Sequence, residues 1–317
     1  MKIKKYSLVL LLMGTYHLAS AQVTNLPIDF NGKQIYIPVK SANGDSLRFI
    51  FDSGSTGSMI DSASAAKAGI SKENRQSVNV AGSGGTQNYD MVTGQNLTLG
   101  GLQIKDLRLV VVDFSALSQD LGKRMDGIIG YDLLTKYVTQ IDFDNRKLIL
   151  YNHISELDTT GYIGIPFEFS KGILIPRFPV SVKLANGETF TGKVMFDTGC
   201  GFTLLVSTPF SKFHHFDEKL GKTLITGGRG MNAETRDQVA VIESMSFDGF
   251  DFGKMQIRLT VNEQAEPKEG YLGIMGIEVI KRFNVIVDYA DKKIYLKPNR
   301  DYKDSFVTTL DLEGEVK

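Results

Sequence analysis

Hydrophobic and polar residues alternate in short runs along most of the chain, and glycine or asparagine residues separate these runs. In LTLGGLQIKDLRLVV (97–111), for example, apolar side chains recur at alternate positions on both sides of a Gly-Gly pair. Such alternation predicts β-strands with one buried face, and Asn-Gly or Gly-Gly pairs between them predict hairpin turns. Helical patterns are few, and short helices are expected only at 61–70 and 277–283. The pattern therefore predicts an all-β fold.

The pattern occurs twice along the chain. FIFDSGSTGSMID (49–61) is repeated as VMFDTGCGFTLLV (194–206), which aligns Asp52 with Asp197. Four further pairs of segments recur in the same order: 39–49 with 182–192, 80–85 with 225–230, 97–111 with 245–259, and 127–150 with 273–296. The repeat unit is about one domain long, which is too large for a solenoid module.

Two similar β lobes are expected, spanning residues 23–158 and 159–317. A pseudo-twofold axis between them would bring Asp52 and Asp197 to one interface. A buried carboxylate is costly unless it is paired and hydrogen-bonded, and two adjacent carboxylates share a proton. One of them can then act as a base on a water molecule while the other, protonated, polarises a carbonyl group.

The motifs around the two carboxylates resemble those of pepsin-like and retropepsin-like aspartic proteases. Asp-Ser-Gly-Ser (52–55) and Asp-Thr-Gly-Cys (197–200) are similar to the Asp-Thr/Ser-Gly signatures of that superfamily. DGIIG (126–130) and LGIMG (272–276) are similar to the two apolar residues and glycine that follow each signature. The resemblance covers nearly the whole chain after the N-terminal segment. It implies two β-barrel lobes with the active site in the cleft between them, a polypeptide substrate, and no metal or cofactor.

By this resemblance Asp52 and Asp197 form the catalytic pair. In the family, the residue after each aspartate contributes to a hydroxyl network between the lobes, and the next glycine lets backbone N–H groups approach the carboxylate. Ser55 is expected to donate to Asp52. The supporting residues of the two turns are Ser53, Gly54, Ser55, Thr198, Gly199 and Cys200.

Cys200 is the one departure from the pepsin-like pattern, which has Ser or Thr at this position. A thiol is a weak hydrogen-bond donor, so the neighbouring carboxylate should have a higher pKa and the enzyme a less acidic pH optimum. Retropepsins have Ala here, so the cysteine does not by itself indicate an inactive enzyme. It is the only cysteine of the chain, so no intramolecular disulfide can form. We expect it to serve as a small buried apolar residue rather than as a nucleophile.

Two Gly-rich loops begin 30 residues after each aspartate (82 − 52 and 227 − 197). They lack the Lys-Ser/Thr of a phosphate-binding loop and lie between alternating runs, so flap-like hairpins over the cleft are expected. Tyr89 is expected at an ordinary strand position. The candidate flap residues are Gly82, Ser83, Gly84, Gly85, Gly227, Gly228 and Gly230.

Composition and the remaining candidates exclude other kinds of site. The formal net charge is zero, and no basic stripe indicates a nucleic-acid partner. His214 and His215 have no spaced third ligand, so no metal site is expected. Asp142 and Asp288 match each other in the repeat and are expected to be solvated or to cap turns. Asp126 has no acidic counterpart.

The N-terminus predicts a secretory signal peptide over residues 1–21. Three lysines precede an apolar run that is shorter than a membrane span, and small residues follow before Gln22. The mature protein is expected to be secreted or periplasmic, without a membrane span. Because one chain carries both lobes, a monomer is expected.

The leading interpretation is an aspartic endopeptidase. The alternative is an inactive pseudoprotease that binds peptides outside the cytoplasm, which Cys200 favours and the intact Asp and Gly residues of both turns disfavour. A glycosidase also needs two carboxylates, but these usually differ in environment, whereas Asp52 and Asp197 have near-identical settings.

Overall fold

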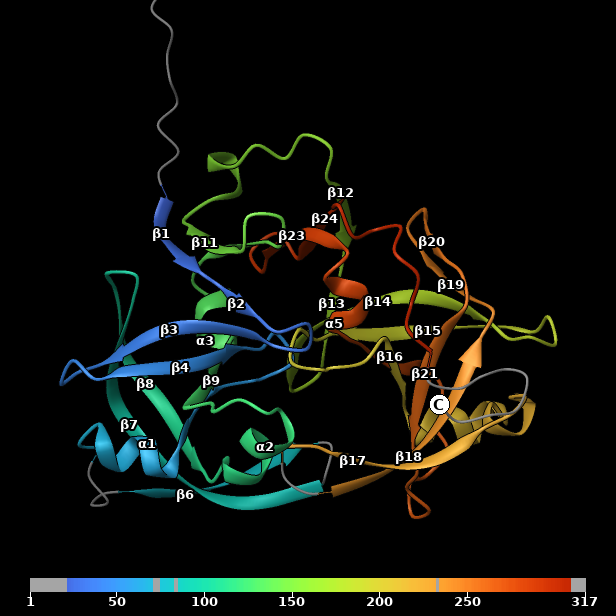
Figure 1. The fold of residues 1–317 in the computed structure, drawn as a ribbon, viewed down its shortest axis with the longest axis horizontal. Helices are drawn as coiled ribbons and strands as arrows, with labels where there is room; N and C mark the ends of the chain where they lie inside the picture. Colours follow the sequence, from blue (N-terminus) through green and yellow to red (C-terminus); the bar gives the residue numbers. More distant parts are fainter. Residues whose placement is uncertain (1–21, 71–74, 83–84, 232–233, 309–317) are drawn as a thin grey trace, which may run out of the picture.

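The computed structural model describes residues 22–70, 75–82, 85–231 and 234–308. This part of the chain is mostly β-sheet, arranged in three sheets, as expected for an all-β protein (Figure 1). The expected signal peptide (1–21) lies outside the described residues. No helix in the described ranges is long and apolar enough to cross a membrane.

The first sheet contains eight strands of the N-terminal half in the order β2-β3-β4-β9-β5-β8-β7-β6. An additional pairing between β3 and β7 bends this sheet back on itself. Its strands are β2 (Asp29–Phe30), β3 (Ile35–Ser41), β4 (Ser46–Phe51), β5 (Ser58–Asp61), β6 (Gln76–Gly82), β7 (Gly85–Leu99), β8 (Leu102–Val112) and β9 (Gly127–Ile129).

The second sheet contains ten strands of the C-terminal half in the order β17-β18-β21-β16-β22-β15-β14-β19-β20, with β13 beside β14. Its strands are β13 (Glu168–Ser170), β14 (Ile173–Lys183), β15 (Thr189–Phe196), β16 (Leu204–Val206), β17 (Leu224–Arg229), β18 (Glu234–Ile242), β19 (Ser244–Phe247), β20 (Phe250–Phe252), β21 (Met255–Thr260) and β22 (Tyr271–Met275).

The two sheets share one connectivity. The order β3-β4-β9-β5-β8-β7-β6 corresponds strand for strand to β14-β15-β22-β16-β21-β18-β17. The two parallel pairings of the first sheet, β4 with β9 and β5 with β8, recur as β15 with β22 and β16 with β21. The repeat seen in the sequence is therefore also a repeat of topology.

The Asn-Gly pairs form the hairpin turns that the sequence predicts. Gly44 connects β3 to β4 and Gly187 connects β14 to β15, each with a φ of +90°. Glycine adopts this left-handed conformation without the steric cost that a Cβ atom adds.

A third sheet combines both halves of the chain. Its order, β1-β11-β10-β23-β24-β12, pairs β10 of the first half with β23 of the second. Its strands β1, β11, β23, β24 and β12 lie together in the upper part of Figure 1. Asp142 and Asp288 cap the turns after β10 and β23, because each accepts backbone N–H groups of its own turn. The strands are β1 (Gln22–Pro27), β10 (Val138–Asp142), β11 (Lys147–Tyr151), β12 (Ile163–Pro166), β23 (Phe283–Asp288) and β24 (Lys293–Pro298).

The helices are short and lie at strand ends. The expected helices at 61–70 and 277–283 are confirmed as α1 and α5, although both are shorter than those ranges. Asp61 caps α1 by accepting the N–H groups of its first turn. The helices are α1 (Ser62–Lys67), α2 (Ser115–Asp120), α3 (Tyr131–Leu134), α4 (Thr208–His214) and α5 (Ile277–Ile280), with 3₁₀ turns η1 (Ile154–Glu156) and η2 (Asp217–Lys219).

The strands β4 and β15 end in the core. Phe49 and Phe51 of β4 and Phe196 of β15 are each at most 1% exposed. Burying such a side chain contributes roughly 1.5–3 kcal/mol, so these strands are firmly anchored up to their last residue. The residue that follows each strand is consequently held in place by a packed core.

Candidate active site

The two predicted aspartates follow these anchored strands and meet. Asp52 comes directly after β4 and Asp197 directly after β15, and their carboxyl groups hydrogen-bond to each other. Each backbone N–H is held in the same way, by the carbonyl of Ile129 at 3.0 Å and by that of Met275 at 3.1 Å respectively. Two residues 145 positions apart thus form one site.

A glycine of each turn faces the opposite carboxyl group. A Cβ atom at Gly54 would lie 2.3 Å from Cγ of Asp197, and one at Gly199 would lie 2.5 Å from Cγ of Asp52. The N–H group of each glycine donates to the aspartate of its own turn at 2.7 Å. Any larger residue at these two positions would push the carboxyl groups apart.

Reciprocal hydrogen bonds join the two turns. The N–H of Ser53 donates to Oγ1 of Thr198, and the N–H of Thr198 donates to Oγ of Ser53, both at 3.0 Å. Each hydroxyl also donates across to the strand before the other turn, to the carbonyl of Phe196 at 2.9 Å and of Phe51 at 3.0 Å. Both hydroxyl groups therefore link the two turns to each other.

Ser55 contacts Asp52 through its backbone rather than through its hydroxyl group. Its hydroxyl donates to the carbonyl of Gly57 at 2.5 Å rather than to Asp52. The backbone N–H of Ser55 bonds to the Asp52 carboxyl instead. The hydroxyl is used to close the turn, which leaves backbone N–H groups as the donors to this carboxylate.

Cys200 contributes its backbone to the site. Its N–H donates to Oδ1 of Asp197 at 3.0 Å. Burial, together with the charge of Asp197, raises the pKa of the Cys200 thiol far above its usual range. The thiol therefore stays protonated at neutral pH, and a protonated thiol is a poor nucleophile.

Burial raises the pKa of both carboxyl groups. For Asp197 the charge of Asp52 raises the pKa further, well above its usual value. Backbone N–H groups oppose these effects by stabilising the ionised forms, and Gly54 and Gly199 are the donors nearest to each carboxyl. Two such carboxyls release their protons as a coupled pair, so one proton is retained between them over an extended pH range.

The glycines of the two apolar-apolar-Gly motifs pack against the turns. A Cβ atom at Gly130 would lie 1.8 Å from the carbonyl oxygen of Asp52, and one at Gly276 would lie 2.3 Å from that of Phe202. The motif therefore has a physical explanation, because only a residue without a side chain permits this approach.

Three residues near the pair carry no recognisable sequence signal. Nε2 of Gln34 donates to the carbonyl of Gly199 at 3.0 Å, a contact across 165 positions. Burial raises the pKa of Tyr271 and of Tyr289, and the charges of Asp197 and Asp52, respectively, contribute to this increase. No motif or periodicity in the sequence marks these positions.

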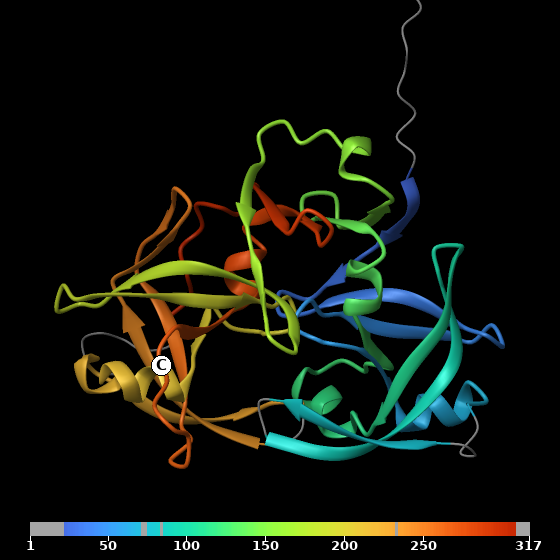
Figure 2. The same cartoon turned by 180° about the vertical axis from the view of Figure 1, so that it is seen from behind.

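Both Gly-rich segments form hairpins, β6–β7 and β17–β18, which approach each other in both views (Figures 1 and 2). Gly82 pairs with Gly85 at the tip of the first, whereas the predicted residues Ser83 and Gly84 lie outside the described residues. Gly227 and Gly228 belong to β17, and Gly230 follows it. Tyr89 lies within β7, as expected.

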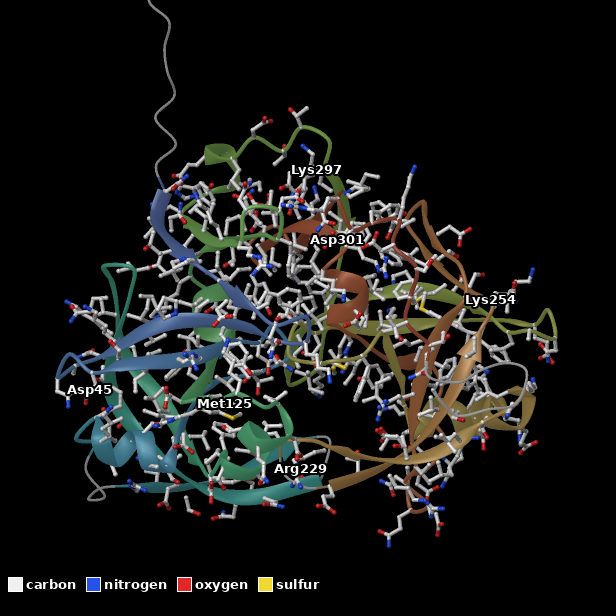
Figure 3. All side chains as sticks on the ribbon, in the orientation of Figure 1. Asp45, Met125, Arg229, Lys254, Lys297 and Asp301 are labelled. Atoms are coloured by element: carbon white, nitrogen blue, oxygen red, sulfur yellow. The ribbon has the colours of Figure 1, made fainter. Side chains whose placement is uncertain are left out.

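The second hairpin contacts the N-terminal half. Arg229, labelled in Figure 3, forms an ion pair with Asp120 of α2. Met231 packs against a cluster of buried N-terminal side chains that includes Phe114 and Met125. This hairpin therefore spans from one half of the chain to the other.

The remaining polar residues that the sequence singled out have structural contacts outside the aspartate pair. Among the described residues, no group of three or more His, Cys, Asp or Glu side chains could hold a metal ion. His214 packs against phenylalanine rings and His215 contacts Glu218. Asp126 is buried and accepts from the Arg48 N–H. A recess of about 500 Å³ over β3 and β4 includes no residue of the two aspartate turns.

Comparison with known proteins agrees with this geometry. Residues 37–133 match the sequence model of a family described as aspartyl protease. The matched range contains the first aspartate turn and the first apolar-apolar-Gly motif. The similarity of this segment supports an aspartyl protease of the retropepsin/pepsin-like superfamily. No curated protein matches the chain significantly.

Proposed function

We propose that the protein is an aspartic endopeptidase that hydrolyses peptide bonds of polypeptides with Asp52 and Asp197. The observation that carries this proposal is the direct hydrogen bond between the two carboxyl groups, within two turns that are held alike. Each carboxyl group faces the glycine of the opposite turn. This is not the environment of a solitary structural carboxylate.

The geometry suggests a general acid–base reaction. With one proton on the pair, the ionised carboxylate removes a proton from a bound water while the protonated carboxyl donates to the scissile carbonyl oxygen. Water attacks the carbonyl carbon to give a tetrahedral intermediate. One carboxyl then protonates the leaving nitrogen while the other takes a proton from a hydroxyl group of the intermediate, so that the C–N bond breaks and the pair again carries one proton. The protein forms no covalent intermediate.

In this proposal the two halves are lobes related by a pseudo-twofold axis, with boundaries at 23–158 and 159–317. The equivalent connectivity of the first two sheets supports it. The substrate lies in a cleft between the lobes, and the hairpins β6–β7 and β17–β18 act as flaps. The signal-like residues 1–21 support a secreted or periplasmic location, and a single chain supplies both aspartates, so a monomer is sufficient.

The test is digestion of a chemically unfolded protein across a pH series, with products identified by mass spectrometry. Wild type is expected to cleave internal peptide bonds, and Asp52→Asn and Asp197→Asn are each expected to abolish cleavage. Peptide binding without cleavage by wild type would overturn the proposal in favour of a pseudoprotease. Full cleavage by both variants would exclude the aspartate pair.

A further inference from the structure

Gln34 lies between β2 and β3 and reaches the opposite catalytic turn. Its Nε2 donates to the carbonyl of Gly199 at 3.0 Å, and the residue is 6% exposed. A carbonyl oxygen only accepts hydrogen bonds, so the amide must present its nitrogen here. This contact therefore fixes the orientation of the Gln34 amide.

The peptide group that Gln34 contacts is bonded to the aspartate pair on its other side. The C=O of Gly199 and the N–H of Cys200 belong to this one peptide group, and that N–H donates to Oδ1 of Asp197 at 3.0 Å. Hydrogen bonds in such a chain polarise one another, so a donor on the carbonyl strengthens the N–H as a donor. Gln34 is thus linked to Asp197 through a single peptide group.

This arrangement is one-sided. The strand register shows this. The position two before Asp52 pairs with Tyr36 of β3, and the position two before Asp197 pairs with Arg177 of β14. Gln34 stands two residues before Tyr36, so its counterpart, two residues before Arg177, is Ile175. An isoleucine side chain has no donor and cannot form the equivalent contact.

The oxygen atom of the Gln34 amide indicates that this residue has a role besides stabilising the fold. Its Oε1 is buried and has no hydrogen-bond partner among the described residues. A buried acceptor without a partner costs stability, and such groups in native proteins call for a functional explanation. An apolar residue, as at Ile175, would avoid this cost.

Among the described residues, few charged and titratable groups lie around Asp197. They are Asp52 of the other turn, Cys200 of its own turn and Tyr271 at the start of β22, with Arg258 of β21 close to Cys200. Burial keeps Tyr271 and Cys200 neutral near neutral pH. Hydrogen-bond donors are therefore the main groups that can stabilise an anionic Asp197.

We propose that Gln34 is a positioning residue of the aspartate pair, which holds and polarises the Gly199–Cys200 peptide group so that its N–H stays aligned with Asp197. In this role it compensates for the missing hydroxyl donor at Cys200. This inference rests on the proposed function, since it concerns the same two carboxyl groups.

The test compares pH–rate profiles of wild type, Gln34→Ala and Gln34→Glu. Gln34→Ala is expected to lower kcat about tenfold with little change in KM, and to move the alkaline limb, at which Asp197 loses its proton, upward by about 0.3–0.6 pH unit. Gln34→Glu keeps the shape of the side chain. It is expected to retain activity at acidic pH, where its carboxyl can donate, and to lose it as that carboxyl ionises.

Gln140→Ala is the matched control. Gln140 also forms side-chain hydrogen bonds, to Tyr151 and Tyr162, but it lies in the third sheet. Its profile is expected to be that of wild type. Wild-type profiles for both Gln34 variants, in an enzyme that Asp52→Asn inactivates, would overturn the inference and leave the proposed function intact.

A second measurement does not require turnover. The carboxyl groups of the pair can be titrated by ¹³C NMR in wild type and in Gln34→Ala. The higher apparent pKa of the pair is expected to rise in the variant, and an unchanged titration would overturn the inference even if no cleavage were observed.

Discussion

Ser53 and Thr198 bind each other through both backbone and side chain, with two reciprocal N–H to hydroxyl hydrogen bonds of 3.0 Å. Both residues are at most 1% exposed. Because Ser53 directly follows Asp52 and Thr198 directly follows Asp197, this contact fixes the distance between the two carboxyl groups. The geometry of the pair thus depends on a buried hydrogen-bond network rather than on the hairpins β6–β7 and β17–β18.

The first prediction concerns this network. Thr198→Val removes the hydroxyl and leaves the Ser53 N–H and the Phe51 carbonyl unpaired in the core, so a loss of about 2–4 kcal/mol in the free energy of unfolding is expected. Denaturant unfolding measures it. Thr191→Val is the control, because its hydroxyl bonds to Ser181 on the surface. Equal small losses for both variants would contradict the buried network.

The second prediction concerns the close approach of backbone and carboxyl. Gly54→Ala is expected to lower kcat/KM by at least about a hundredfold, since the new methyl would overlap the Asp197 carboxyl and displace it. Gly57→Ala, in the same loop, meets no atom within 4 Å and should retain activity. Steady-state kinetics on one peptide substrate distinguishes them, and similar activities for both variants would contradict the account.

The third prediction concerns Cys200. Cys200→Thr supplies a hydroxyl donor beside Asp197, which favours the ionised form and should move the alkaline limb of the pH–rate profile down by about 0.5–1 unit. Cys200→Ala removes a weak donor only and should leave the limb in place. An unmoved profile for the threonine variant would show that this side chain does not influence the pair.

The fourth prediction concerns stability and pH. Burial raises the pKa of Asp197 in the folded protein above its unfolded value of about 4, so the folded protein binds its proton more tightly. Wild type therefore loses stability as pH rises from the unfolded pKa to the folded pKa. Asp197→Asn does not lose stability in this way. Its Tm at pH 7 should exceed that of wild type by about 2–4 °C for each kcal/mol of destabilisation that the substitution removes.

Thermal unfolding at pH 3.5 and pH 7 checks this result. The advantage of Asp197→Asn should be present at pH 7 and largely absent at the lower pH, where the wild-type carboxyl is mostly protonated in both states. Asp251→Asn, at an exposed position of β20, is the control and should show no pH-dependent difference. A variant that is less stable than wild type at pH 7 would contradict a raised pKa.

Much of the site could be predicted because its information is local and duplicated. The aspartate turns, the Asn-Gly hairpins at Gly44 and Gly187, and the glycines that pack against the turns all occupy short motifs. Their spacing is enforced by turn geometry and by backbone contacts that exclude a Cβ atom. A second copy in the same order made each motif stronger evidence than it would be alone.

The remaining features depend on contacts between distant segments. Alternation shows which face of a strand is buried but not which strand pairs with it, so the third sheet, where β10 meets β23, could not be predicted. The Gln34 contact is equally nonlocal. The Ser55 hydroxyl could choose between two acceptors within its own turn, and only the folded geometry shows that it bonds to Gly57.

The most direct test of the central claim is a double-mutant comparison of cleavage rates. Asp52→Asn, Asp197→Asn and the double variant are assayed on one peptide, with folding verified for each. If the two carboxyls work as a unit, each single variant loses nearly as much kcat as the double variant, because half of a shared acid–base pair cannot act alone. Losses that simply multiply, or a single variant that keeps wild-type kcat, would contradict a shared catalytic pair.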